Sequence, residues 1–290
     1  MKNLVLLYVL LWIVPTLIFA WLPIPENAGS VQRSLISFFF IALYILLAAN
    51  LAYRTIVVII NSGTGILYHC AAAVVVIFGV LYVFSGIWGK SQILSAFLTA
   101  ILLFGAAAAG AVLSTAVKRI GELLPLCLTA ATADLMSVLR GPTRVMADDI
   151  VAYYEGGMEG TPPFIDYVII KAGIPGFSIP VPLFGVTDWI LVALLSASLF
   201  RLNTSENIFS GGAAMGKHVF LPVSACSLYA AIVIAQITGV FIPAMLFISF
   251  FFLLFLFSHF KLYRELRKSD LFYSIVFPGS VALLVLLFAG

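Results

Sequence analysis

The chain has 290 residues, of which 63% are hydrophobic and 9% are charged, and its mean hydropathy is +1.18. An ordinary soluble domain carries about 25% charged residues, so this composition excludes one. The net charge of +3 is too small to indicate a nucleic-acid partner. We therefore expect an all-α polytopic protein that is integral to the lipid bilayer.

Nine apolar runs are long enough to cross a bilayer, which takes roughly 17 to 25 residues per helix. They cover residues 4–22, 34–53, 66–88, 92–117, 120–139, 184–200, 218–237, 240–258 and 271–289. The length of the first run favours a retained helix over a cleaved signal peptide. The second is the hardest to bound, because apolar sequence continues past Arg54 and leaves room for a bent or additional segment.

The placement of the lysines and arginines predicts the orientation. With a cytoplasmic N-terminus, ten of the fifteen basic residues fall on the cytoplasmic side, including the cluster "KLYRELRK" near the C-terminus. The long hydrophilic loop at residues 140–183 then lies outside. We divide the chain into N-terminal membrane helices (1–119), a core that contains this loop (120–258), and a basic loop with a last helix (259–290).

The outer loop has three parts with different patterns. The stretch "PTRVMADDIVAYY" favours an amphipathic helix at the membrane interface, and "EGGMEGTPP" is typical of a flexible loop. In "FSIPVPLF" the apolar residues alternate, but Pro180 and Pro182 favour an edge strand or an extended segment over a central strand.

Two carboxylates are predicted inside the membrane. Glu122 follows Lys118 and Arg119 at a span end, where pairing or water satisfies it. Asp134 and Asp188 lie within spans, each roughly 6 to 8 Å below the same outer face. The other nine acidic residues fall in loops or beyond span ends: Glu26, Asp148, Asp149, Glu155, Glu159, Asp166, Glu206, Glu265 and Asp270.

Buried carboxylates are costly in a membrane and usually mark function. Two that lie close together tend to share one proton, so one can act as a base on water while the other hydrogen-bonds a substrate carbonyl, as in aspartic proteases. The same pair would also suit a proton- or cation-coupled transporter. In "GVFIPAMLF", Pro243 lies at a similar depth at a helix start, where proline is well tolerated.

Three stretches together resemble the presenilin and signal peptide peptidase family of intramembrane aspartyl proteases. In "ADLMSVLRGPTR" the similarity is carried by Asp134, Leu135, Val138, Leu139, Gly141, Pro142 and Arg144. In "FGVTDWILVALLSAS", Gly185 and Asp188 resemble the Gly-x-Gly-Asp motif. In "IPAML", the residues Pro243, Ala244 and Met245 resemble the Pro-Ala-Leu motif.

The resemblance implies a presenilin-like helical fold in which Asp134 and Asp188 form the catalytic pair. Gly185, Thr187 and the segment Pro243 to Met245 would shape the cleft, and "GFSIPVPLF" would offer an edge to an extended substrate. The implied substrates are single-span membrane segments or signal peptides, and neither a metal nor an organic cofactor is needed. The outer position of the loop resembles the signal peptide peptidases and is opposite to presenilins. The sequence does not indicate an oligomeric state.

The chain also departs from the family pattern. Ala133 stands where a tyrosine is usual, Thr187 replaces the second glycine, and Met245 replaces leucine. Four predicted spans, rather than five, precede the first aspartate, and one follows the proline motif. A catalytically silent relative that binds transmembrane partners therefore stays as a further alternative. Trp189, beside the second aspartate, is interpreted as an aromatic residue at the membrane interface.

Overall fold

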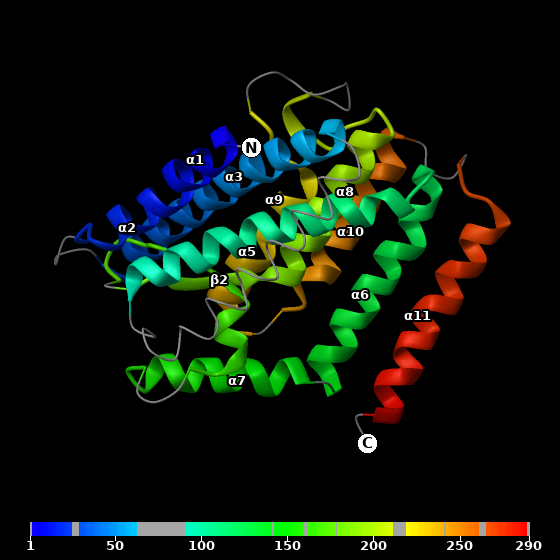
Figure 1. The fold of residues 1–290 in the computed structure, drawn as a ribbon. Coiled ribbons are helices and arrows are strands. Elements are labelled where there is room, and N and C mark those ends of the chain that lie inside the picture. Colours follow the sequence, from blue (N-terminus) through cyan, green and yellow to red (C-terminus); the bar gives the residue numbers. More distant parts are fainter. Residues whose placement is uncertain are drawn as a thin grey trace. The chain divides into compact units, whose positions relative to one another are not determined.

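The computed structural model (Figure 1) describes residues 2–24, 29–62, 91–140, 142–158, 162–177, 179–210, 219–240, 242–260 and 265–288. Most of them are helical. The chain forms two compact units, of which the first comprises Met1–Val112 with Gly160–Ala193 and the second Leu113–Glu159 with Leu194–Gly290. Each unit consists of two separate stretches of the chain, whereas the three segments predicted from the sequence (1–119, 120–258 and 259–290) are each continuous. The predicted third span, 66–88, lies outside the described residues.

Four helical segments among the described residues are long and apolar enough to cross a membrane. They are Ser30–Ser62, Gln92–Ala116, Ile120–Arg140 and Lys268–Leu287. Three shorter apolar helices cover Leu6–Ala20, Val223–Thr238 and Ala244–His259. The expected helical architecture is thus confirmed, and these long apolar helices fit a membrane protein, while the count of nine spans stays a prediction.

The N-terminal helix of the first unit contains one wide turn. Helix α1 (Lys2–Tyr8) continues through the π-helical segment η1 (Val9–Ile13) into α2 (Val14–Ala20). Pro15, near the start of α2, has no N–H to donate to the preceding turn, so the series of helical hydrogen bonds is interrupted next to the π-helical segment.

Helix α3 (Ser30–Ser62) runs past Arg54 without a break, so the apolar sequence after that arginine belongs to the same helix. The Tyr8 hydroxyl lies 3.0 Å from the Thr55 hydroxyl, which joins α1 to α3. The Tyr8 ring also packs edge-on against Phe104 of α5 (Gln92–Leu113) at a centroid distance of 5.6 Å. These contacts form the core of the first unit.

A two-stranded antiparallel sheet forms in the last part of the hydrophilic loop predicted at residues 140–183 and extends to Gly185. Strand β1 (Ile169–Ala172) pairs with β2 (Val181–Gly185), with a bulge between Ile170 and Lys171. The extended segment expected at "FSIPVPLF" is therefore confirmed, and its partner strand is a new finding. Lys171 of β1 forms an ion pair with Asp166, with 2.6 Å between Nζ and Oδ2. Asp166 lies in the 3₁₀ turn η4 (Phe164–Tyr167), just before this sheet.

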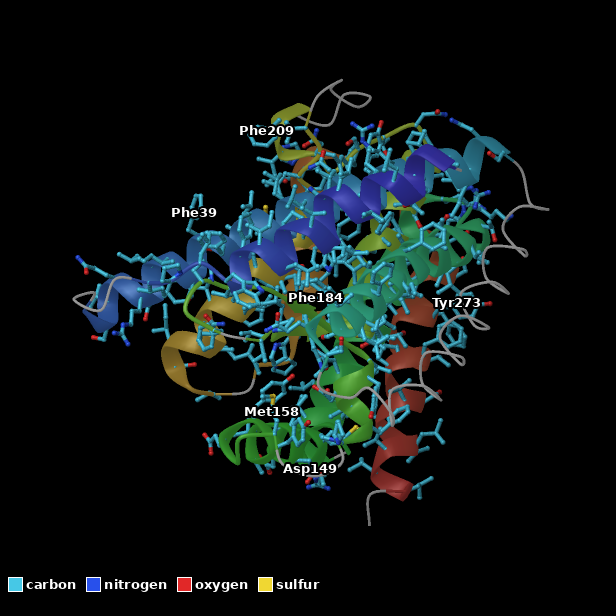
Figure 2. The ribbon with its side chains drawn as sticks, turned by 60° about the vertical axis from the view of Figure 1, so that its left-hand side comes forward. Phe39, Asp149, Met158, Phe184, Phe209 and Tyr273 are labelled. Atoms are coloured by element: carbon cyan, nitrogen blue, oxygen red, sulfur yellow. The ribbon has the colours of Figure 1, made fainter. Side chains whose placement is uncertain are left out.

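The second unit is built around α6 (Leu123–Arg140), which packs against α7 (Pro142–Glu155), α10 (Ala244–His259) and α11 (Lys268–Phe288). Helix α9 (Val223–Thr238) packs against α10. Helices α6 and α11 run side by side (Figure 1). Figure 2 shows Asp149 on α7 and Met158 in the turn after it, so the helix predicted for this stretch is present, while its place at the membrane interface stays a prediction.

An arginine holds the start of α11 against the start of α6. The Arg119 guanidinium donates two hydrogen bonds to the Asp270 carboxylate, at 3.0 and 3.3 Å, just before the 3₁₀ turn η3 (Ile120–Glu122). Its Nε lies 3.2 Å from Glu122, so the expected pairing of Glu122 at this span end is confirmed. A side chain at Gly121 would meet Asp270 Oδ2 at 2.7 Å and the Glu265 carbonyl at 2.9 Å.

We predict that Gly121→Ala lowers the stability of the purified protein, because the added methyl group overlaps a backbone carbonyl as well as a carboxylate. Overpacking of this kind costs about 1–3 kcal/mol. Gly279→Ala is the matched control, since it lies inside α11 with nothing within 4 Å, and alanine is the better helix former. Thermal unfolding in detergent compares the two. Equal unfolding midpoints for Gly121→Ala and Gly279→Ala would contradict a close approach of the start of α6 to the start of α11.

Candidate active site

Asp134 lies on α6, less than two turns before the helix ends, and its side chain is half-buried. Its Oδ2 accepts a hydrogen bond of 2.8 Å from the backbone N–H of Met245, 111 positions away in the sequence. The neighbouring amide of Leu246 also lies close to this carboxylate. Two of the three motif segments singled out in the sequence are therefore in direct contact.

The start of α10 explains this contact. Pro243 is the N-cap residue, with an extended backbone (φ −63°, ψ 107°) and no side chain that can cap the helix. The first amides of a helix have no partner within it and carry the positive end of the helix dipole. Asp134 satisfies one of these amides from another helix, so the carboxylate serves as the missing cap of α10.

The length of α10 makes this cap more important. A helix of 16 residues is about 24 Å long, which is shorter than the hydrocarbon core of about 30 Å. If α10 spans the bilayer, one of its ends lies below the surface, where an unsatisfied amide costs several kcal/mol. The Asp134 carboxylate then satisfies a backbone donor of α10 at this end, whatever further role it has.

Asp188 lies in the first turn of α8 (Val186–Arg201), two residues after the helix begins. Its Oδ2 accepts a hydrogen bond of 3.1 Å from the N–H of Gly185, the residue before the helix. This is one half of a capping box, in which an acidic residue in the first turn reaches back to the N-cap amide. The sequence placed both aspartates in spans, but it did not show that each binds a backbone amide at a helix start.

Gly185 leaves room for that carboxylate. A Cβ at this position would lie 3.1 Å from Asp188 Oδ2 and 3.5 Å from the Thr187 hydroxyl, which is tighter than normal packing on the carboxylate side. Thr187 itself is exposed, so its side chain points away from the packed interior of the first unit. The glycine of this motif is therefore explained by space beside Asp188.

Trp189 differs from its sequence interpretation as an interfacial aromatic. The side chain is completely buried and packs against Phe184 at a ring-centroid distance of 5.3 Å. Phe184 is the fourth residue of β2 (Figure 2), so this pair joins the sheet to the start of α8. The rigid connection fixes the position of Asp188 relative to β2.

The two aspartates belong to different compact units, Asp134 to the second and Asp188 to the first. Each is positioned within its own unit by a backbone amide. The pairing of the two carboxylates stays a prediction.

A third carboxylate, Glu206, was assigned to a loop from the sequence. It does lie in the connection after α8, but it is fully buried. Nothing in the local pattern of "NTSEN" distinguishes it from an exposed loop residue.

Comparison of the chain with protein-family models, with curated proteins and with solved structures found no match. The family resemblance therefore depends on the three motif segments alone, and the contact between Asp134 and Met245 is independent of it.

We expect Asp134→Ala to lower the unfolding midpoint by an amount equivalent to about 0.5–2 kcal/mol, because the first turn of α10 loses its cap. Asp134→Asn keeps an acceptor oxygen and should retain most of the wild-type stability. Met245→Leu is the control, since it changes the side chain and leaves the amide in place. If Asp134→Asn has the same unfolding midpoint as Asp134→Ala, the acceptor oxygen that caps α10 contributes nothing to stability.

Proposed function

We propose that the chain is an intramembrane aspartyl protease of the presenilin and signal peptide peptidase type. The single observation that carries the proposal is the hydrogen bond between Asp134 and the Met245 amide. It links the segment that resembles the first catalytic motif to the segment that resembles the proline motif. If the similarity of these short apolar segments to the family motifs were due to chance, there would be no reason for the two segments to be in contact.

The proposed reaction is hydrolysis of a peptide bond by water. One aspartate takes a proton from water, whose oxygen attacks the carbonyl carbon, while the other aspartate, protonated, donates a hydrogen bond to the carbonyl oxygen. The C–N bond then breaks, and the amine leaves with a proton from the pair. The Met245 amide supports this chemistry because it fixes the orientation of the Asp134 carboxyl group.

The sheet offers a means of holding the substrate. A transmembrane helix must unwind before water reaches its peptide bonds, and the exposed backbone then needs hydrogen-bond partners. Strands β1 and β2 form a sheet of only two strands, so each has a second edge that no described strand pairs with. We propose that an unwound substrate adds to an edge of β2, directly before Asp188.

The proposed substrates are single-span membrane segments or signal peptides. The placement of basic residues supports a nine-span topology with a cytoplasmic N-terminus, in which the loop between the aspartates lies outside. Substrates would then enter with their own N-termini in the cytoplasm, as the resemblance to signal peptide peptidases implies.

The proposal is tested by cleavage of a tagged single-span reporter in liposomes containing the purified protein. We expect Asp134→Asn and Asp188→Asn each to lower the cleavage rate by about 10²-fold or more, because each removes one half of the acid–base pair. Asp149→Asn, an exposed carboxylate on α7, is the matched control and should cleave normally.

Two outcomes would contradict the protease. Wild-type protein that cleaves no reporter but carries protons or cations across the liposome, with flux lost in both Asn variants, would identify a transporter. Wild-type protein with neither activity that still binds transmembrane partners would identify a silent relative.

Thr187 and Gly185 provide a finer test. We expect Thr187→Gly to raise the cleavage rate of reporters with bulky residues at the cut site, since it removes an exposed branched side chain beside Asp188. Gly185→Ala should slow every reporter, because its Cβ crowds the Asp188 carboxylate. The measurement is kcat/KM for reporters that differ only at the cut site. A uniform loss of rate in Thr187→Gly would show that the threonine is needed.

A further inference from the structure

Glu206 is a buried carboxylate that the proposed reaction does not use. It lies in the connection between α8 and α9, and its side chain has no exposed surface. Its Oε1 lies 2.6 Å from the Ser196 hydroxyl and 2.9 Å from the Ser224 hydroxyl, and its Oε2 accepts a hydrogen bond of 2.9 Å from the Ser224 amide. No basic side chain forms an ion pair with it in the described part of the chain.

These bonds join two helices. Ser196 is on α8, and Ser224 is in the first turn of α9, whose N-cap residue, Pro222, has no capping side chain. The backbone is bonded at the same place, because the Val223 amide donates to the Glu206 carbonyl at 3.1 Å. Glu206 is therefore both a cap for α9 and the link from α9 back to α8.

Asn207 keeps the connection folded around Glu206. Its side chain accepts a hydrogen bond from the Leu221 amide and donates one to the Val219 carbonyl, at 3.1 and 3.0 Å. The residue is itself buried and forms an isolated β-bridge with Pro222. The carboxyl group is thus enclosed by packed backbone, away from water.

The surroundings of Glu206 disfavour its charge. Burial raises the pKa of this carboxyl group to about 7, although the three hydrogen bonds oppose the shift. Among the described residues, the thiols of Cys127 on α6 and Cys226 on α9 lie near enough to interact electrostatically with Glu206, and an ordinary thiol is mostly uncharged at pH 7. The Arg201 guanidinium, at the end of α8, donates instead to the Ser114 carbonyl. Lys217 and His218, in the same connection, lie outside the described residues.

We infer that Glu206 is a proton-binding site that controls the connection between α8 and α9: the bound proton locks the two helices together, and its loss loosens them. A protonated carboxyl group can donate to the Ser196 hydroxyl while its other oxygen still accepts from the Ser224 amide, so the enclosed site carries no net charge. An ionised group in the same site must be hydrated, which requires the connection to open. The inference does not depend on the proposed protease activity.

The sign of the effect follows from linkage. The unfolded chain releases this proton near the ordinary pKa of 4.5, whereas the folded chain holds it up to a pKa of about 7. Between these values the folded state binds more protons, so stability falls as the pH rises from about 5 to about 7 and then levels off. Carboxylates that are stabilised as anions by ion pairs give the opposite slope, but below the ordinary carboxyl pKa and therefore outside this pH range.

The test compares wild type with Glu206→Gln by thermal unfolding in detergent from about pH 5 to about pH 8. We expect the wild-type midpoint to fall by roughly 5 °C over this range. The Gln variant should lack this fall and should melt above wild type at the upper pH, since its amide is neutral and keeps the acceptor oxygen. Glu122→Gln, a carboxylate in an arginine ion pair, and His218→Gln are the controls and should keep the wild-type slope.

Two results would overturn the inference: a Gln variant with the wild-type slope, or a loss of that slope in His218→Gln. If Glu206→Gln does not fold, infrared spectra of wild-type protein with ¹³C-labelled glutamate give the answer without a variant. A labelled carboxylic-acid band that disappears as the pH rises through about 7 supports the site. Its absence at about pH 5.5, where an ordinary glutamate is ionised, would contradict it.

Discussion

Helix starts that need a carboxylate are the constraint on which much of this structure depends. Four helices begin with an amide bound by an acidic side chain: α8 by Asp188, α9 by Glu206, α10 by Asp134 and α11 by Asp270. Where such a helix start is buried, as it is around Glu206 and Ser224, water does not satisfy the amides, so a start without a cap would leave a costly unpaired donor. Few charges are available in a chain with 9% charged residues, and this use accounts for several of them.

The four carboxylates fall into two geometric classes. Asp188 and Asp270 each lie in the first turn of their own helix and reach back to the N-cap amide, so these capping contacts are local. Asp134 and Glu206 cap helices that begin elsewhere in the chain, and each cap therefore also fixes the packing of two segments. Only in the second class is the cap itself a tertiary contact, and the proposals on Asp134 and Glu206 draw on that class.

Three of these carboxylates differ in whether a neighbouring group neutralises their charge. Asp270 faces the Arg119 guanidinium and is held as an anion in a structural contact between α6 and α11. Glu206 has hydroxyl and amide partners, and its burial favours the protonated form. Asp134 has backbone amides on one side, which orient it without neutralising it.

The sequence by itself predicted an apolar, mostly helical chain that fits a membrane protein. It also located the helices that carry Asp134, Asp188 and Met245, the helix at Pro142–Glu155 and the extended segment before Gly185. These features depend on periodicity, proline and apolar length, which act locally. Only the tertiary structure decided that α3 continues past Arg54, that β2 has a partner strand, that Trp189 is buried, and that Asp134 meets Met245. The burial of Glu206 belongs to the same group. Each of these depends on which segments pack together across long separations, and a polar residue in a loop looks the same in sequence whether the loop faces water or closes around it.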